Sequence, residues 1–279
     1  MSYLLFKRGN DLGGWIVFLI AAFVYGMTIE PTASFWDCPE FISCAEKLQV
    51  GHPPGAPFYM LVGNLFTQFA SDASQVSHMV NFLNALLSAG CILFLFWSIT
   101  RLVRSILTDD ARKLSTTDVI IILGAGFVGA LAYTFSDTFW FSAVEGEVYA
   151  FSSFLTALVF WMILRWQDEA DSISGDRWII LIAYIIGLSI GVHLLNLLCI
   201  PAIVLVFYYQ KYQAISLKGV IGTIALSGLL IVLILFVYIP GIADMGGWFE
   251  LFFVNVLGFP FQTGLIIFLT LVLSLLIGA

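Results

Sequence analysis

SFWDCPEFISCAEKLQVGHPPGAPFY, residues 34–59, is a long polar and aromatic interruption in the first hundred residues of a very apolar chain. It follows a hydrophobic segment at residues 14–29. The run Asp37-Cys38-Pro39-Glu40 has the residues of a helix start, with an Asp N-cap, a proline in the first turn and a Glu three residues after the cap. The apolar spacing that follows predicts a short amphipathic helix on the membrane surface. A second interfacial helix is predicted over residues 58–69.

The composition of the whole chain is typical of an integral membrane protein. Of its 279 residues, 61% are hydrophobic and 10% charged, and the mean hydropathy is +1.01. Soluble domains carry about 25% charged residues. The sequence therefore predicts an all-α integral membrane bundle of about eight spans, at residues 14–29, 79–100, 118–135, 148–166, 178–193, 195–209, 219–239 and 264–278. The weak break at residues 191–196 leaves open whether the fifth and sixth spans form a hairpin or one long bent helix.

The basic residues predict the orientation of the bundle. With the N-terminus in the cytoplasm, only Lys47 lies on the outer side. The other ten of the eleven basic residues fall on the cytoplasmic side: Lys7, Arg8, Arg101, Arg104, Arg112, Lys113, Arg165, Arg177, Lys211 and Lys218. Most carboxylates and all three histidines then lie outside. Such an acidic outer face argues against nucleic acid as a partner.

The sequence does not support a cysteine metal site, a disulfide framework, a repeat protein or a soluble domain. The four cysteines have neither the spacing of a metal site nor the density of a disulfide framework, although a bridge between Cys38 and Cys44 is conceivable. No internal repeat, phosphate-binding loop or soluble domain is evident. We therefore expect one membrane domain over residues 1–279, with its first outer loop at residues 30–77, forming the N-terminal part of a longer protein.

Four motifs carry a resemblance to a known family. Trp36–Phe41, Gly51–Gly55, Ala143–Ala150 and Gly187–Asn196 together resemble the transmembrane-protein-260-like protein O-mannosyltransferase family, which is placed among the GT-C glycosyltransferases. The resemblance implies transfer of a sugar, with mannose expected, from a polyprenyl-phosphate donor to Ser or Thr hydroxyls of secreted or periplasmic proteins. Bacterial members of the family imply an inner-membrane location with the active site on the periplasmic side.

Two carboxylates of the first outer loop are the candidate catalytic residues. A hydroxyl that attacks an anomeric carbon needs a nearby base, and Asp37, at the outer membrane surface, is expected to be that general base. Glu40 lies one helical turn along and either orients the acceptor or completes the helix cap. His52 either stiffens the proline turn or belongs to the site.

The candidate substrate-binding residues come from several outer loops. Glu145 and Glu147 either bind sugar hydroxyls, bind a divalent cation that bridges the donor phosphate, or form a solvated acidic turn. Two carboxylates are weak grounds for a metal, so the metal ligands are unassigned and no other cofactor is expected. Trp36 and Tyr149 are suited to stacking on a sugar ring, but they also suit an aromatic belt at the membrane interface. His193 and Asn196 form a polar pair that either belongs to the site or makes helix–helix hydrogen bonds.

A different class of function remains open from the sequence. A non-enzymatic polyprenyl-lipid carrier, a flippase or an assembly subunit would also be an apolar helical protein. Transporters, however, carry ionisable residues near the bilayer midplane, whereas the ionisable residues here crowd at the outer span ends. If the enzyme interpretation holds, Glu145 or Glu147 and His193 face the same outer cavity as Asp37. Should both glutamates project into solvent, they would keep only a role in the turn.

Overall fold

The computed structural model describes residues 2–108, 114–170, 172 and 175–278. Arg112 and Lys113 of the predicted cytoplasmic set lie outside the described residues. All regular secondary structure in the described part is helical, which confirms the predicted all-α class. The chain divides into two compact units, Met1–Cys199 and Ile200–Ala279. The prediction of a single domain stays a prediction.

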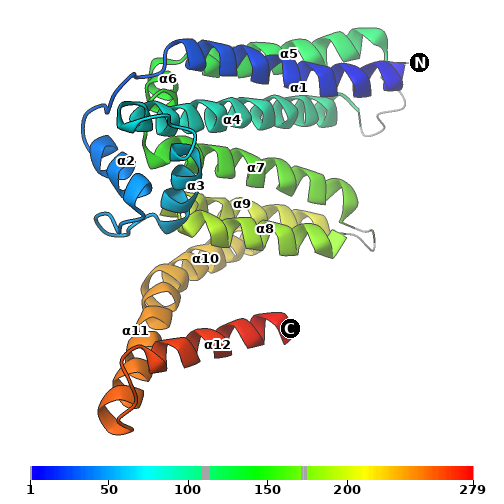
Figure 1. The fold of residues 1–279 in the computed structure, drawn as a ribbon. Helices are drawn as coiled ribbons and strands as arrows, with labels where there is room; N and C mark the ends of the chain where they lie inside the picture. The colour runs from blue at the N-terminus through cyan, green and yellow to red at the C-terminus, as the bar shows by residue number, and fades with distance from the viewer. Residues whose placement is uncertain (1, 109–113, 171, 173–174, 279) are drawn as a thin grey trace. The chain divides into compact units, whose positions relative to one another are not determined.

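Unit 1 is a helical bundle with α4 at its centre. Its helices are α1 (Ser2–Met27), α2 (Cys38–Lys47), α3 (Pro57–Thr67), α4 (Val76–Leu107), α5 (Thr116–Thr134), α6 (Asp137–Ala143), α7 (Val148–Glu169) and α8 (Gly175–Ile190), with short 3₁₀ turns η1 (Ala73–Gln75) and η3 (Leu194–Leu198). Helix α4 packs against α1, α5 and α7. Figure 1 shows these long helices side by side, with α2 and α3 at one end of the bundle.

The long helices confirm that the protein is an integral membrane protein. Six helical segments of the described chain are long and apolar enough to cross a bilayer: Tyr3–Met27, Ala73–Leu107, Thr116–Thr134, Val148–Glu169, Leu194–Lys211 and Leu217–Val256. The other two predicted spans correspond to α8 and α12 (Thr263–Gly278), which have 16 residues each. A total of eight spans therefore stays a prediction. The chain leaves the helical path at residues 191–193 before η3, so α8 and α9 (Cys199–Lys211) are separate helices, not one continuous one.

Unit 2 corrects one predicted loop. An outer loop was expected after residue 239, but the helix that starts as α10 (Leu217–Leu233) continues through α11 (Ile239–Leu251) to Val256. A π turn at Ile234–Tyr238 joins α10 to α11, a second at Phe252–Val256 extends α11, and Pro240 closely follows the first of them. The Glu250 carboxylate accepts hydrogen bonds from the backbone N–H groups of Gln262 and Leu265 at 2.5 and 3.0 Å. Glu250 thus supports the start of α12.

The first outer loop folds as the two short helices that were predicted. Helix α2 buries Phe41, Ile42 and Ala45 in a core shared with α3, α4 and α7, whereas Leu48, which follows its last turn, is 55% exposed. Leu48 has φ +48° and ends the helix, so its side chain leaves the buried face. A Cβ at Gly63 of α3 would lie 2.9 Å from the Ala45 Cβ, closer than carbon atoms approach, so glycine allows α2 and α3 to pack.

Candidate active site

A small cleft lies at the end of unit 1 that carries α2 and α3. Its volume is about 100 Å³, and it is bounded by the start of α2, the proline turn, the start of α7 and the segment that follows α8. The lining residues are Asp37, Phe41, His52, Pro54, Gly55, Ala56, Glu147, Val148, Tyr149, Val192 and His193. The structure therefore brings Asp37, His52, Glu147, Tyr149 and His193 together, although they lie far apart in the sequence.

Asp37 stands at the N-cap position of α2 but does not cap the helix. Its backbone is α-helical, with φ −87° and ψ −5°, and its side chain makes no capping hydrogen bond. An N-cap residue normally has an extended backbone that lets its side chain reach back to the first turn. The predicted capping role is therefore wrong, and the exposed carboxylate faces the cleft, with Oδ2 at 3.9 Å from His52 Nε2.

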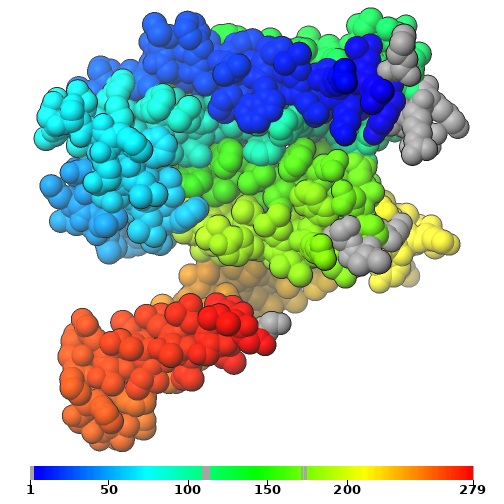
Figure 2. All heavy atoms as spheres, turned by 45° about the vertical axis from the view of Figure 1, so that its right-hand side comes forward, coloured from blue at the N-terminus to red at the C-terminus, as the bar shows by residue number. Residues whose placement is uncertain are grey.

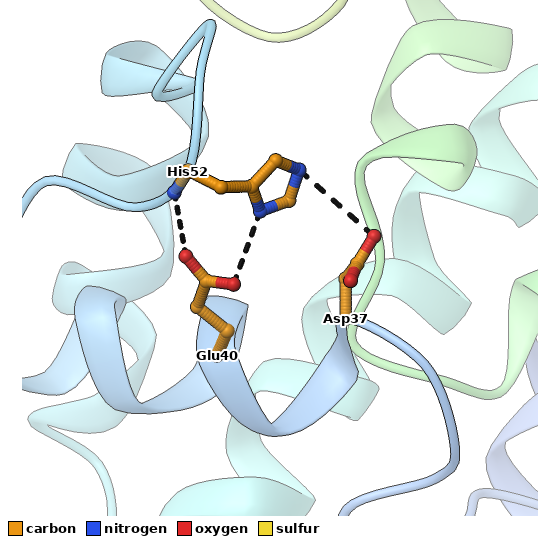
Figure 3. A group of neighbouring side chains, drawn as sticks. All are labelled: Asp37, Glu40 and His52. Atoms are coloured by element: carbon orange, nitrogen blue, oxygen red, sulfur yellow. Dashed lines mark hydrogen bonds and ion pairs between the residues drawn. The ribbon is translucent and has the colours of Figure 1, made fainter.

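Glu40 binds the proline turn and does not complete a capping box. Its carboxylate accepts hydrogen bonds from the backbone N–H of His52 at 2.5 Å and pairs with His52 Nδ1 at 3.0 Å (Figure 3). The hydrogen bond from the His52 backbone, followed by that from its ring, lowers the pKa of Glu40. The same carboxylate raises the pKa of His52, with a smaller contribution from Asp37. The imidazole therefore lies between two carboxylates and favours its charged form.

The turn Glu145-Gly146-Glu147 is buried. Glu145 and Glu147 are each 6% exposed, so the alternative of a solvated acidic turn is wrong. A Cβ at Gly146 would lie 2.9 Å from both Asn81 Oδ1 and Ile42 Cγ1, so only glycine fits. This close packing holds Glu147 at the edge of the cleft and Glu145 behind it.

Asn84 fixes this turn and was not found from the sequence. Its fully buried side-chain N–H₂ donates to the carbonyl oxygens of Glu145 at 2.5 Å and Glu147 at 2.7 Å. One turn earlier on α4, the Asn81 side chain donates to the carbonyls of Glu30 and Thr32 at 2.6 and 2.9 Å. Two asparagines spaced three residues apart in an apolar span share one helix face, and that pattern was the available signal.

Burial makes the two glutamates weak acids. Burial, with contributions from Glu145 and Asp37, raises the pKa of Glu147 to about 7. Burial also raises the pKa of Glu145, which contacts Cys38 and Ser34. The thiol of Cys38 and the backbone N–H of Asp37 favour the charged form of Glu147 but do not offset its burial. The cleft thus combines one exposed carboxylate with a buried carboxyl group that titrates near neutral pH.

Tyr149 and His193 form the far wall of the cleft. Their ring centroids are 5.5 Å apart. His193 caps η3, because its Nδ1 accepts a hydrogen bond from the backbone N–H of Leu195 at 3.1 Å, and burial lowers its pKa. Both features favour the neutral ring with its proton on Nε2. His193 therefore offers the cleft a neutral hydrogen-bond donor.

Three predicted substrate-binding residues do not line the cleft: Trp36, Glu145 and Asn196. Trp36 is 90% exposed, with φ +61°, and does not line the cleft. Asn196 is fully buried; its Oδ1 accepts from the Cys199 thiol at 3.2 Å, and its Nδ2 has no partner among the described residues. Roles in substrate binding for Trp36, Asn196 and the buried Glu145 stay predictions. The thiols of all four cysteines are free, so Cys38 and Cys44 form no bridge.

The residues best arranged for a divalent cation differ from those expected. Ligand atoms of Asp37, Glu40 and His52 all lie within 4.8 Å of one another, whereas the sequence suggested Glu145 and Glu147. Two carboxylates and an imidazole are ligands suited to Mn²⁺ or Zn²⁺. The ring of His52 is already hydrogen-bonded to Glu40, so a cation would replace that bond. A requirement for a cation stays a prediction.

We expect stability to depend on pH through Glu147. Its carboxyl is a weaker acid when folded than when unfolded, so its contribution is fully present below about pH 4.5, the unfolded value, and is lost as the pH rises through about 7. The charged or ionisable groups around it are Glu145, Asp37, Cys38, His52 and Tyr59. The melting temperature of the parent should therefore fall between pH 5 and 8. The Glu147→Gln variant should show a clearly smaller fall, measured by thermal unfolding in detergent. An equal fall in both proteins would contradict the assignment.

Comparisons with known proteins agree with the motifs. The family described as the protein O-mannosyl-transferase TMEM260 N-terminal domain matches residues 37–216, more than half of the chain. Among curated proteins, a protein O-mannosyl-transferase tmem260 of Dictyostelium discoideum is 23% identical over 201 residues, covering 70% of this chain and 22% of its own length. The protein O-mannosyl-transferase TMEM260 of Mus musculus is 26% identical over 215 residues, covering 76% of this chain and 28% of its own length. The chain thus spans about a quarter of the length of these relatives. No solved structure matches it significantly.

Proposed function

Because the chain belongs to the family of the protein O-mannosyl-transferase TMEM260 N-terminal domain, we propose that it is a membrane glycosyltransferase of the GT-C type. It moves a sugar, with mannose expected, from a polyprenyl-phosphate donor to Ser or Thr hydroxyls of exported proteins. The membership confirms the resemblance drawn from the sequence motifs. The names of the relatives support the reaction class, and the proposed site lies on the outer face of a bacterial inner membrane.

The observation that carries the proposal is the uncapped Asp37 at the cleft. Its carboxylate makes no capping hydrogen bond, although Asp37 stands at the N-cap position of α2. Instead it faces a cleft that also presents an imidazole whose pKa is raised by Glu40, a weakly acidic carboxyl and a histidine whose pKa is lowered by burial. Such a collection of differently charged groups around one small cavity is typical of catalytic sites and unusual for a structural turn.

The proposed reaction uses Asp37 as the general base. The acceptor hydroxyl oxygen bonds to the anomeric carbon while the bond from that carbon to the phosphate oxygen breaks. Asp37 takes the hydroxyl proton, and the lipid phosphate leaves with the electron pair of the broken bond. The cleft volume of about 100 Å³ is smaller than the 300 Å³ or more of typical ligand pockets. It fits the acceptor hydroxyl and one edge of the sugar, and the remainder of the donor lies outside it.

His52 supplies positive charge for the donor phosphate in this proposal. The predicted outer face has only one other cationic side chain, Lys47. Glu40 holds the imidazole in place and favours its protonated form, which stabilises the phosphate that leaves. A divalent cation held by Asp37, Glu40 and His52 is the alternative source of charge. Chelation followed by re-addition of Mn²⁺ or Mg²⁺ distinguishes the two.

The function is tested with the full-length protein in detergent or liposomes. Polyprenyl-phosphate mannose and a Ser/Thr-containing peptide are supplied, and mass spectrometry measures the peptide with one added hexose. We expect time-dependent transfer that requires the donor lipid. The non-enzymatic carrier, flippase or assembly subunit would bind the donor but leave the peptide unmodified. Donor binding without any transfer would therefore overturn the enzymatic proposal, and the matching polyprenyl-phosphate glucose tests the choice of sugar.

Glu40 is proposed as a positioning residue, which gives a graded prediction. Glu40→Gln keeps an acceptor for the His52 backbone N–H but removes the charge that raises the pKa of the imidazole. We expect transfer to fall about tenfold, a smaller loss than removal of a general base. If protonated His52 is needed, the alkaline limb of the pH–rate profile should also move to lower pH. A uniform loss of rate with an unmoved profile would assign Glu40 a purely structural role.

A further inference from the structure

A second cavity lies at the opposite end of unit 1 from the cleft. Its volume is about 330 Å³, and it is formed by the beginning of α1 and the final turns of α4 and α7. Figure 2 turns this end forward and shows the dark-blue start of α1 beside the green of α7. The charged residues that line it are Lys7, Asp11, Arg101, Arg104, Arg165 and Asp168. The basic-residue pattern assigns this end to the cytoplasm.

The charges around this cavity favour an anion. Four lining side chains are cationic and two are carboxylates, Asp11 and Asp168, which leaves a formal charge of 4 − 2 = +2. Glu169 pairs with Arg165 at 3.2 Å from outside the cavity, and counting it leaves +1. The excess therefore remains positive either way. An excess of positive charge inside a concave surface attracts an anion more strongly than the same charges on a flat surface.

Asp168 holds two of the arginine side chains in place, but the positive charge of the cavity is not fully compensated. Asp168 binds Arg101 through two hydrogen bonds, one of them Nε to Oδ2 at 2.9 Å, and lies 3.6 Å from Arg104 Nη2. One carboxylate thus fixes two guanidinium groups. Lys7 forms no ion pair with any described residue. Its ammonium group is therefore free to bind a ligand.

The position of the cavity near the ends of its helices indicates that the anion belongs to a membrane lipid. Lys7 and Arg101 lie five and six residues from the ends of α1 and α4, or roughly 8–9 Å along a helix. Trp97 and Trp161 line the cavity with their ring centroids 5.7 Å apart, as amphipathic rings do near lipid headgroups. We propose that this cavity binds the phosphate-bearing headgroup of an anionic membrane lipid in the cytoplasmic leaflet. The same phosphate chemistry would suit a soluble phosphate, which the experiment separates.

The test is lipid-dependent thermal stabilisation of the full-length protein in detergent. Phosphatidylglycerol is titrated in, with phosphatidylcholine and inorganic phosphate as separate arms, and the melting temperature is recorded. We expect a saturable rise with phosphatidylglycerol alone. Lys7→Gln should raise the half-saturating concentration about tenfold, because a charge-assisted hydrogen bond is lost. Arg8→Gln removes the same charge from the next residue of α1, which does not line the cavity, and should stay within twofold of the parent.

Three other outcomes of this experiment would contradict the proposal. Equal weakening by Lys7→Gln and Arg8→Gln would mean non-specific attraction to a basic surface. An equal, Lys7-dependent rise with inorganic phosphate would assign the cavity to a soluble ligand, and no saturable rise would remove the site. Lys7 is exposed and forms no ion pair among the described residues, so Lys7→Gln should fold as the parent does. Arg104→Gln provides a second, independent variant of the same cavity.

Discussion

Asp37→Asn should abolish most sugar transfer while leaving the folded protein intact. Loss of a general base lowers a rate by about 10²–10⁴-fold, whereas loss of a helix cap costs only about 1 kcal/mol of stability. Here even the smaller cost should be absent, because the Asp37 side chain makes no capping hydrogen bond. The measurement is transfer to a Ser/Thr peptide from a saturating donor, together with thermal unfolding of both proteins.

Asp72 provides the matched control in the same outer loop. It is a genuine N-cap, since its carboxylate accepts from the Ser74 backbone N–H at 2.8 Å, and it does not line the cleft. Asp72→Asn keeps a good capping residue and should transfer sugar within twofold of the parent. Transfer by Asp37→Asn within a few-fold of the parent would contradict its role as base. The search would then move to the carboxylates of Glu40 and Glu145.

Asn84→Ala should have the largest effect on stability and should also impair transfer. The substitution removes the donor to the buried carbonyl of Glu147, one of the two donors to that of Glu145, and the acceptor of the buried Tyr59 hydroxyl. Each buried polar group left without a partner costs about 1–3 kcal/mol. We expect a loss of about 2–6 kcal/mol, seen as a clear fall in melting temperature, and a lower rate of transfer because Glu147 loses its fixed place at the cleft.

Ser88 separates this effect from general sensitivity of α4. It lies one turn further along the same helix and is fully buried, and its hydroxyl has no hydrogen-bond partner among the described residues. Ser88→Ala therefore removes an unsatisfied group and should leave stability unchanged or slightly higher. Comparable destabilisation by Asn84→Ala and Ser88→Ala would show that the asparagine bonds do not hold the acidic turn.

Local patterns in the sequence predicted most of the fold. Long apolar runs cannot be solvated and must form helices in a membrane, so their positions follow from composition and length. The two short helices of the first outer loop follow from a proline-containing start, an amphipathic stripe and a proline-rich turn, all of which act within a few residues. The predicted outer loop after residue 239 failed because composition does not specify where a long apolar helix ends, and π turns let this one continue to Val256.

The sequence by itself therefore determined the membrane class, the two loop helices and the motifs that define the family. Only the tertiary structure decided what the chemistry-bearing side chains do. Asp37 and Glu40 have the spacing of a capping box, but the backbone of Asp37 is helical and Glu40 binds His52 instead, twelve residues away. Glu147 became a buried, weakly acidic group because α4 and α2 close over its turn. Hydrogen-bond partners and burial depend on contacts between distant segments, and the local sequence carries no record of those contacts.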